Sequence, residues 1–81
     1  MASNGENGSI GRSDRRVLGL LAIAPQGRAD LKFIAMFTLE LLELVKARLV
    51  DVHADTLRID GRRIKTARVF ITAAGRKKLE D

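Results

Sequence analysis

The chain has 81 residues and a formal net charge of +5, and 46% of its residues are hydrophobic. This length allows one domain at most, and the core must be aliphatic because there are three Phe and no Trp or Tyr. The absence of cysteine excludes disulfides and Cys-ligated metal sites. No apolar run reaches the roughly 18 residues of a membrane span, and the polar N-terminus lacks the apolar core of a signal peptide. We therefore expect a soluble, cytoplasmic protein without a membrane partner.

The first helix should follow a polar tail. Residues 1–12 are rich in Ser, Asn and Gly with a single Ile, so we expect them to be disordered and one domain to occupy residues 13–81. Ser13 is a suitable N-cap for a helix over residues 14–24. That helix should stop at the turn signal Pro25-Gln26-Gly27.

The next stretch predicts two short helices. A single helix over residues 31–49 would be apolar nearly all round, and Thr38 is the residue best suited to cap a new start. Splitting there predicts helices over residues 30–36, with Asp30 at the first cap, and over 39–49.

The apolar period then changes to two, which predicts a hairpin. Asp60-Gly61 favours a two-residue type I′ turn, because both residues tolerate positive φ. The resulting register sets Leu57 against Ile64, Val52 against Val69, Val50 against Ile71 and Arg58 against Arg63. Thr72 is then a suitable cap for a short final helix.

The apolar phase of this hairpin flips between residues 52 and 57 and again between 64 and 69. Strong twist or paired bulges would accommodate the flip. Alternatively, the tip projects beyond the core, and Leu57, Ile59 and Ile64 cover one another or a partner.

Charge is concentrated in the last third of the chain. Residues 1–47 carry six Lys or Arg against five Asp or Glu, whereas residues 58–78 carry eight basic residues and only Asp60 in opposition. Such asymmetry is typical of a nucleic-acid footprint, although a basic surface also serves solubility.

The order of elements and the motifs from LELVKARLVDV onward resemble winged helix-turn-helix domains, most closely MarR-type transcriptional regulators. Asp60 and Arg62 match the Asp-x-Arg element of that family's wing, and residues 71–76 (ITAAGR) match its Leu-Thr-x-x-Gly-Arg element. The resemblance covers residues 39–79, and residues 13–37 match by helix order alone. It implies an α+β fold with a three-helix bundle, an antiparallel β-hairpin wing and a short C-terminal helix.

Three departures limit what the resemblance implies. Arg48 stands where the family usually has Gly, the wing is longer, and the family's long dimerisation helices are absent. A small-molecule sensor at a dimer interface is therefore not expected. The expected function is non-enzymatic DNA binding, as a transcriptional regulator or accessory factor, with a helix in the major groove and the wing on a neighbouring minor groove or backbone.

The candidate DNA-binding residues lie mainly on the hairpin. A phosphate between Arg58 and Arg63 would turn the repulsion of two facing cations into a shared contact; the alternative is that both side chains splay into water. The full candidate set is Arg58, Arg62, Arg63, Lys65 and Arg68 from the hairpin, with Thr38 and Lys46 from the third helix.

The third helix favours a different function. Its expected exposed face carries Glu40 and Glu43, which are unfavourable near phosphate unless they accept from cytosine amines. The alternative function is therefore protein–protein association, with a second copy or a partner, through this helix. In a small protein, a broad apolar face such as this one is more often simply core.

Candidates for chemistry are few. His53 is the only histidine, so no His pair can bind a metal, and the pairing register makes it an ordinary strand residue opposite Arg68. The hairpin aspartates lack the compact loop of a calcium site, and the Ser and Thr hydroxyls have no base to activate them. We expect no catalysis, no cofactor and no metal.

Overall fold

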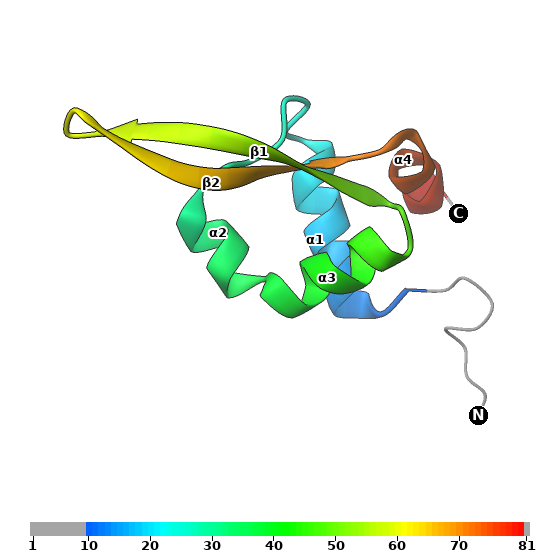
Figure 1. The fold of residues 1–81 in the computed structure, drawn as a ribbon. Coiled ribbons are helices and arrows are strands. Elements are labelled where there is room, and N and C mark those ends of the chain that lie inside the picture. Colours follow the sequence, from blue (N-terminus) through cyan, green and yellow to red (C-terminus); the bar gives the residue numbers. More distant parts are fainter. Residues whose placement is uncertain (1–9, 81) are drawn as a thin grey trace.

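The computed structural model describes residues 10–80 and shows four helices and a two-stranded antiparallel sheet. The expected α+β class is confirmed. The long hairpin lies across the helices and extends beyond them at its turn (Figure 1), which gives a molecule of 50 × 22 × 16 Å. The elements are α1 (Arg12–Ala22), α2 (Leu31–Met36), α3 (Thr38–Lys46), β1 (Val50–Ile59), β2 (Arg62–Ile71) and α4 (Ala73–Glu80).

Helix α1 begins two residues earlier than predicted. Its N-cap is Gly11, which has no side chain to cap the helix, and Ser13 lies in the first turn. The Ser13 hydroxyl donates instead to Glu40 Oε2 at 2.7 Å and so links α1 to α3. The predicted Ser13 cap is therefore wrong. Of the predicted tail, residues 1–9 lie outside the described residues.

The predicted split between the second and third helices is confirmed. Asp30 caps α2, and its Oδ1 accepts from the amides of Lys32 at 3.0 Å and Phe33 at 3.2 Å. Phe37 separates α2 from α3. Thr38 does not cap α3 as predicted, because its hydroxyl donates backwards to the carbonyl oxygens of Ile34 and Ala35 in α2.

Helix α3 ends at Lys46, three residues before its predicted end. Arg48 has a φ of 63°, and the amides of Arg48 and Leu49 bond to Val45 O and Leu44 O at 2.9 Å. This pattern is a Schellman motif, in which glycine usually occupies the left-handed position. Arg48, which stands where the resembled family usually has Gly, thus adopts the left-handed conformation that glycine favours.

The hairpin register is the predicted one over its whole length, from Val50 opposite Ile71 to Ile59 opposite Arg62. Asp60 and Gly61 have φ of 52° and 78°, as a type I′ turn requires. Because the pairing is unbroken, twist and not bulges explains the flip in apolar phase. The strands visibly cross along the ribbon (Figure 1), and two-stranded ribbons twist more than larger sheets.

A short segment after α1 forms a single β-bridge to the outer edge of β2. The amide and carbonyl of Arg28 bond to the carbonyl and amide of Val69, at 2.8 and 2.9 Å. The predicted turn after α1 precedes this bridge and is closed by a bond from Gly27 N to Ala24 O. Gly27 has a φ of 79° and lies against the backbone of Val69, so a side chain there would meet both strain and a clash.

The core lies where the base of the hairpin meets the helices. Leu18, Leu21 and Leu44 are fully buried, and Val50, Val69 and Ile71 close the core from the hairpin. Helix α4 packs onto α1 and β2. As predicted, Thr72 caps this helix, because its hydroxyl accepts from Gly75 N at 3.0 Å. The same hydroxyl donates to Arg48 O at 2.9 Å, which ties α4 to the end of α3.

Two helical glycines provide a test of this packing. A Cβ at Gly75 would lie 2.7 Å from Ile71 Cγ1 and against the backbone of Leu49, whereas a Cβ at Gly19 would meet nothing within 4 Å. Close packing therefore does not explain Gly19. We expect Gly75→Ala to destabilise the domain by about 1–3 kcal/mol through overpacking. Gly19→Ala should stabilise it by about 0.5–1 kcal/mol through helix propensity. Denaturant unfolding measures both, and equal effects of the two changes would contradict the packing of α4.

Candidate functional site

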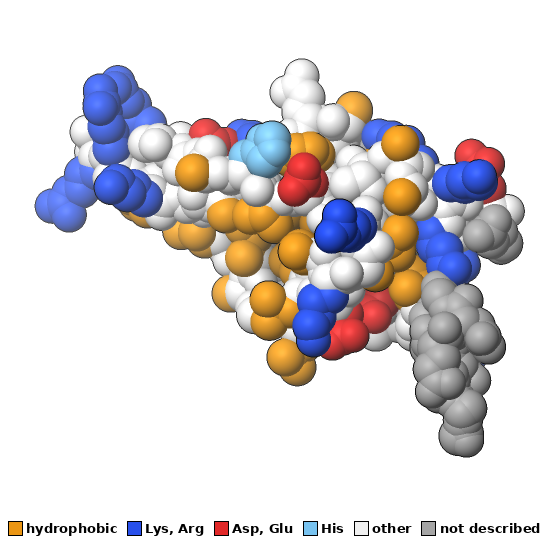
Figure 2. All heavy atoms as spheres, turned by 45° about the vertical axis from the view of Figure 1, so that its right-hand side comes forward, with side chains coloured by type: hydrophobic (Ala, Val, Ile, Leu, Met, Phe, Trp, Pro, Cys, Tyr) orange, Lys and Arg blue, Asp and Glu red, His pale blue; other side chains and the backbone are white. Residues whose placement is uncertain are grey.

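The strongest concentration of charge lies on the outer half of the hairpin. Arg58, Arg62, Arg63 and Lys65 are all exposed. Lys and Arg side chains gather at the free end of the hairpin (Figure 2). Within residues 10–80, the ion pairs involve Arg28, His53 and Arg68, and none of these four side chains. The outer hairpin therefore presents four cations without internal neutralisation.

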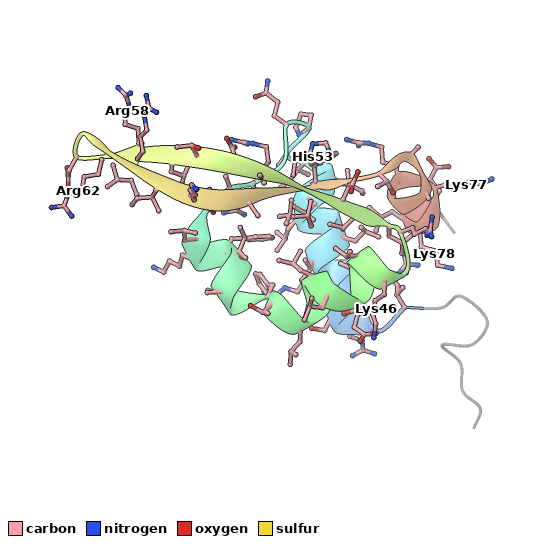
Figure 3. All side chains as sticks on the ribbon, in the orientation of Figure 1. Lys46, His53, Arg58, Arg62, Lys77 and Lys78 are labelled. Atoms are coloured by element: carbon pink, nitrogen blue, oxygen red, sulfur yellow. The ribbon has the colours of Figure 1, made fainter. Side chains whose placement is uncertain are left out.

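The register places these cations on two sides of the ribbon. Arg58 and Arg63 face each other across the strands, and paired residues project to the same side. Arg62 belongs to the neighbouring pair and projects to the other side. Arg58 and Arg62 point in opposite directions at the tip, and Arg58 points away from the helices (Figure 3). An anion beside the Arg58–Arg63 pair would relieve the like-charge repulsion.

Arg68 differs from the other predicted hairpin residues. Its Nε donates to Asp55 Oδ2 at 2.7 Å, and its guanidinium also donates to Gln26 O at 3.2 Å. The amide of Thr56 and the Arg68 guanidinium together lower the pKa of Asp55. Arg68 thus holds the turn after α1 against the hairpin, and its charge is balanced by Asp55.

Thr38 and Lys46 are not brought together with the hairpin tip. The Thr38 hydroxyl is committed as a donor to Ile34 O at 2.9 Å and Ala35 O at 3.1 Å. Lys46 is exposed in the last turn of α3 and lies far along the molecule from Arg62 (Figure 3). The predicted residues therefore form one group on the outer hairpin and two isolated positions on α3.

Helix α3 and the end of α2 expose apolar side chains, and of the predicted acidic face of α3 only Glu43 is fully exposed. Met36, Leu39 and Leu42 are 63%, 76% and 57% exposed, and hydrophobic side chains are visible on the body beneath the hairpin (Figure 2). Glu40 is only half-exposed and accepts from Ser13 on α1. The predicted outward face is therefore confirmed at Glu43, whereas Glu40 is bonded to α1.

The carboxylates between α1 and α3 form a local negative cluster. Partial burial raises the pKa of Asp14, and the charges of Glu43 and Glu40 raise it further. The hydrogen bond from Ser13 lowers the pKa of Glu40. This cluster lies on the helical body and not on the hairpin (Figure 1), so it does not oppose a ligand at the hairpin tip.

A second basic group lies at the other end of the molecule, on α4. Lys77 and Lys78 are in its last turn and project at the end away from the hairpin tip (Figure 3). The charge count of the last third of the chain included both residues, but they were not predicted as site residues. Lys77 and Lys78 lie away from the hairpin tip because of the direction of α4, and a count of charges along the sequence does not predict that direction.

His53 lies opposite Arg68, as predicted. Its ring packs edge-on against Phe70 with centroids 4.7 Å apart, and its Nε2 lies 3.6 Å from Asp51 Oδ2. Over the described range, no three His, Asp or Glu side chains are grouped to hold a metal ion.

Comparison of the chain with protein-family models, curated proteins and solved structures gave no match. Across residues 10–80, every helix is too short or too polar to cross a bilayer.

The Asp55–Arg68 contact predicts a measurable pKa change. The pKa of Asp55 lies below its ordinary value of 3.8, so its stabilising contribution is present at neutral pH and is lost as the pH falls below 3.8. Arg68→Ala should raise the pKa of Asp55 part of the way back, because the Thr56 amide remains. NMR titration of the carboxyl carbons measures this change. Asp30 serves as the control, because its pKa is lowered by Phe33 and Arg28. An unaltered Asp55 pKa in the variant would contradict the contact.

Proposed function

We propose that the chain is a winged helix domain that binds double-stranded DNA through its hairpin, the wing, as a small regulator or accessory factor. The order of three helices, a hairpin and a closing helix supports the fold proposal. The short bridge between Arg28 and Val69, before α2, adds a third strand position beside the wing. The left-handed backbone at Arg48, where the resembled family has Gly, adds local support.

One observation carries the DNA proposal: four cations project beyond the folded body on a narrow ribbon, with no ion pair recorded for them among residues 10–80. A folded domain gains no stability by placing Arg58 directly against Arg63. A phosphate backbone would neutralise both charges and release its counterions, which is the main source of affinity in non-specific DNA binding.

The proposed binding is led by the wing and has little sequence preference. The exposed surface of α3 carries Leu39, Leu42 and Glu43, which cannot donate hydrogen bonds to base edges, and its exposed cation, Lys46, lies only in the last turn. Phosphate contacts position a protein on the duplex but carry no direct sequence information. The major-groove role that the resemblance implied for α3 is therefore not part of this proposal.

A second candidate function is protein association through the apolar strip, defined as Met36, Leu39 and Leu42. All three side chains are more than half exposed, and a row of such residues on one surface is typical of an interaction site. In this function the domain would meet a second copy or a partner through the strip.

Salt dependence separates the two functions. We expect affinity for a random-sequence duplex to fall steeply from low to moderate salt. Arg62→Ala/Arg63→Ala should reduce the slope of log affinity against log salt by about 2, because each lost phosphate contact removes about 0.9. Fluorescence anisotropy at several salt concentrations measures this slope.

The matched control is Arg12→Ala/Arg16→Ala, which removes the same charge from exposed positions of α1. It should leave the slope close to that of the unmodified protein. Equal slopes for both double variants would contradict wing-led binding. An absence of binding at low salt, together with a dimeric mass in solution, would favour the second candidate function.

A further inference from the structure

The two edges of the hairpin are protected differently. Val69 shows which amides of β2 point away from β1, because its amide donates to the carbonyl of Arg28 and not to β1. Val69 lies opposite Val52. In such a non-hydrogen-bonded pair, the amides of both residues point away from the partner strand, so the Val52 amide points away from β2. By alternation along β1, the amides of Ala54, Thr56 and Arg58 also point away from β2.

The edge of β1 that faces away from β2 is the kind of edge that can pair with another strand. The strand has ten residues and is exposed along most of its length. A long row of unpaired amides and carbonyls is a template for pairing with another chain. On β2, by contrast, the Arg28 bridge covers part of the edge.

Two aspartates occupy the β1 edge at a spacing of four residues. Asp51 Oδ1 accepts from the amide of Val52 at 3.0 Å, and Asp55 Oδ1 accepts from the amide of Thr56 at 2.8 Å. The second oxygen of Asp55 is held by Arg68, whose Nε lies 2.7 Å away, and the second oxygen of Asp51 lies 3.6 Å from His53 Nε2. The Arg68 contact orients Asp55 so that its Oδ1 faces the outward amide of Thr56, and the Oδ1 of Asp51 faces the outward amide of Val52.

We propose that the β1 edge is a self-pairing surface that Asp51 and Asp55 hold closed, and that the partner it would otherwise accept is the β1 edge of a second copy. An antiparallel pairing centred on Ala54 would set Val52 opposite Thr56 of the second copy. Each of these amides would have to leave its carboxylate to bond across the new interface. In that register each Asp55 would lie opposite His53 of the other copy and each Asp51 opposite Leu57, so that Asp51 of one copy and Asp55 of the other would be diagonal neighbours on one face of the new sheet.

This closure is independent of DNA binding. It explains why Asp51 and Asp55 stand on an otherwise cationic ribbon. It also keeps the hairpin as a single two-stranded finger, because a copy paired along β1 would cover one side of its outer half.

The direct test removes both carboxylates with Asp51→Ala/Asp55→Ala. We expect this variant to gain mass with increasing concentration in sedimentation experiments, relative to the unmodified protein, and to show slowed amide exchange at Ala54. Glu40→Ala/Glu43→Ala controls for the change in net charge. A folded variant that keeps the unmodified protein's mass at every concentration would overturn the proposal, as would equal association of the charge control.

A single substitution keeps the proposal testable if the double variant fails to fold. Asp51→Ala should speed hydrogen exchange of the Val52 amide by roughly tenfold, as expected for the loss of a charge-assisted hydrogen bond, and should leave Thr56 unchanged. An unaltered exchange rate at Val52 would show that Asp51 does not close the edge.

Discussion

The positive φ values of Asp60 and Gly61 fix the register of the hairpin, and the distribution of charge and apolar surface depends on that register. A slip of one residue would turn every side chain of one strand to the other face. Val69 and Ile71 would then leave the core, and Arg63 would no longer face Arg58. The same turn therefore seals the core at the base of the ribbon and sets the cationic pair at its tip.

Twist gives the two halves of the hairpin different environments without any break in pairing. Val50 faces the core at the base of the ribbon, and the series of alternate residues that begins with it reaches Arg58 at the tip. Arg58 nevertheless points away from the helices (Figure 3), because the ribbon has rotated along its length. The inner half is thus part of the domain core and the outer half is a separate surface.

The sequence predicted the parts of the fold that are governed by local chemistry. Asp60-Gly61 defined the register, Asp30 defined the start of α2, and Thr72 defined the start of α4. The end of α3 was missed because Arg48 adopts a left-handed conformation that is unusual for a side chain of its size. Ser13 was misassigned because its hydroxyl bonds to Glu40, a contact between distant positions that no local pattern indicates.

Some residues of the candidate site were predicted correctly and others were not. The outer hairpin cations followed from the register alone. Arg68 was not recognised as a structural residue, because its partner Asp55 lies diagonally across the strands and its other contact is the Gln26 carbonyl. The outward face of α3 was predicted only in part, because the sequence did not decide whether its broad apolar face is core or exposed. In the structure, Leu41 and Leu44 enter the core while Leu39 and Leu42 remain exposed.

The division of the molecule into a helical body and a cationic finger is the claim on which the proposed function depends. Mapping backbone amide shifts while a duplex is added tests it most directly. We predict that the perturbed amides fall within residues 56–68 and that those of α1 and the core stay unchanged. Shifts confined to residues 39–47, with the hairpin tip unaffected, would contradict the account.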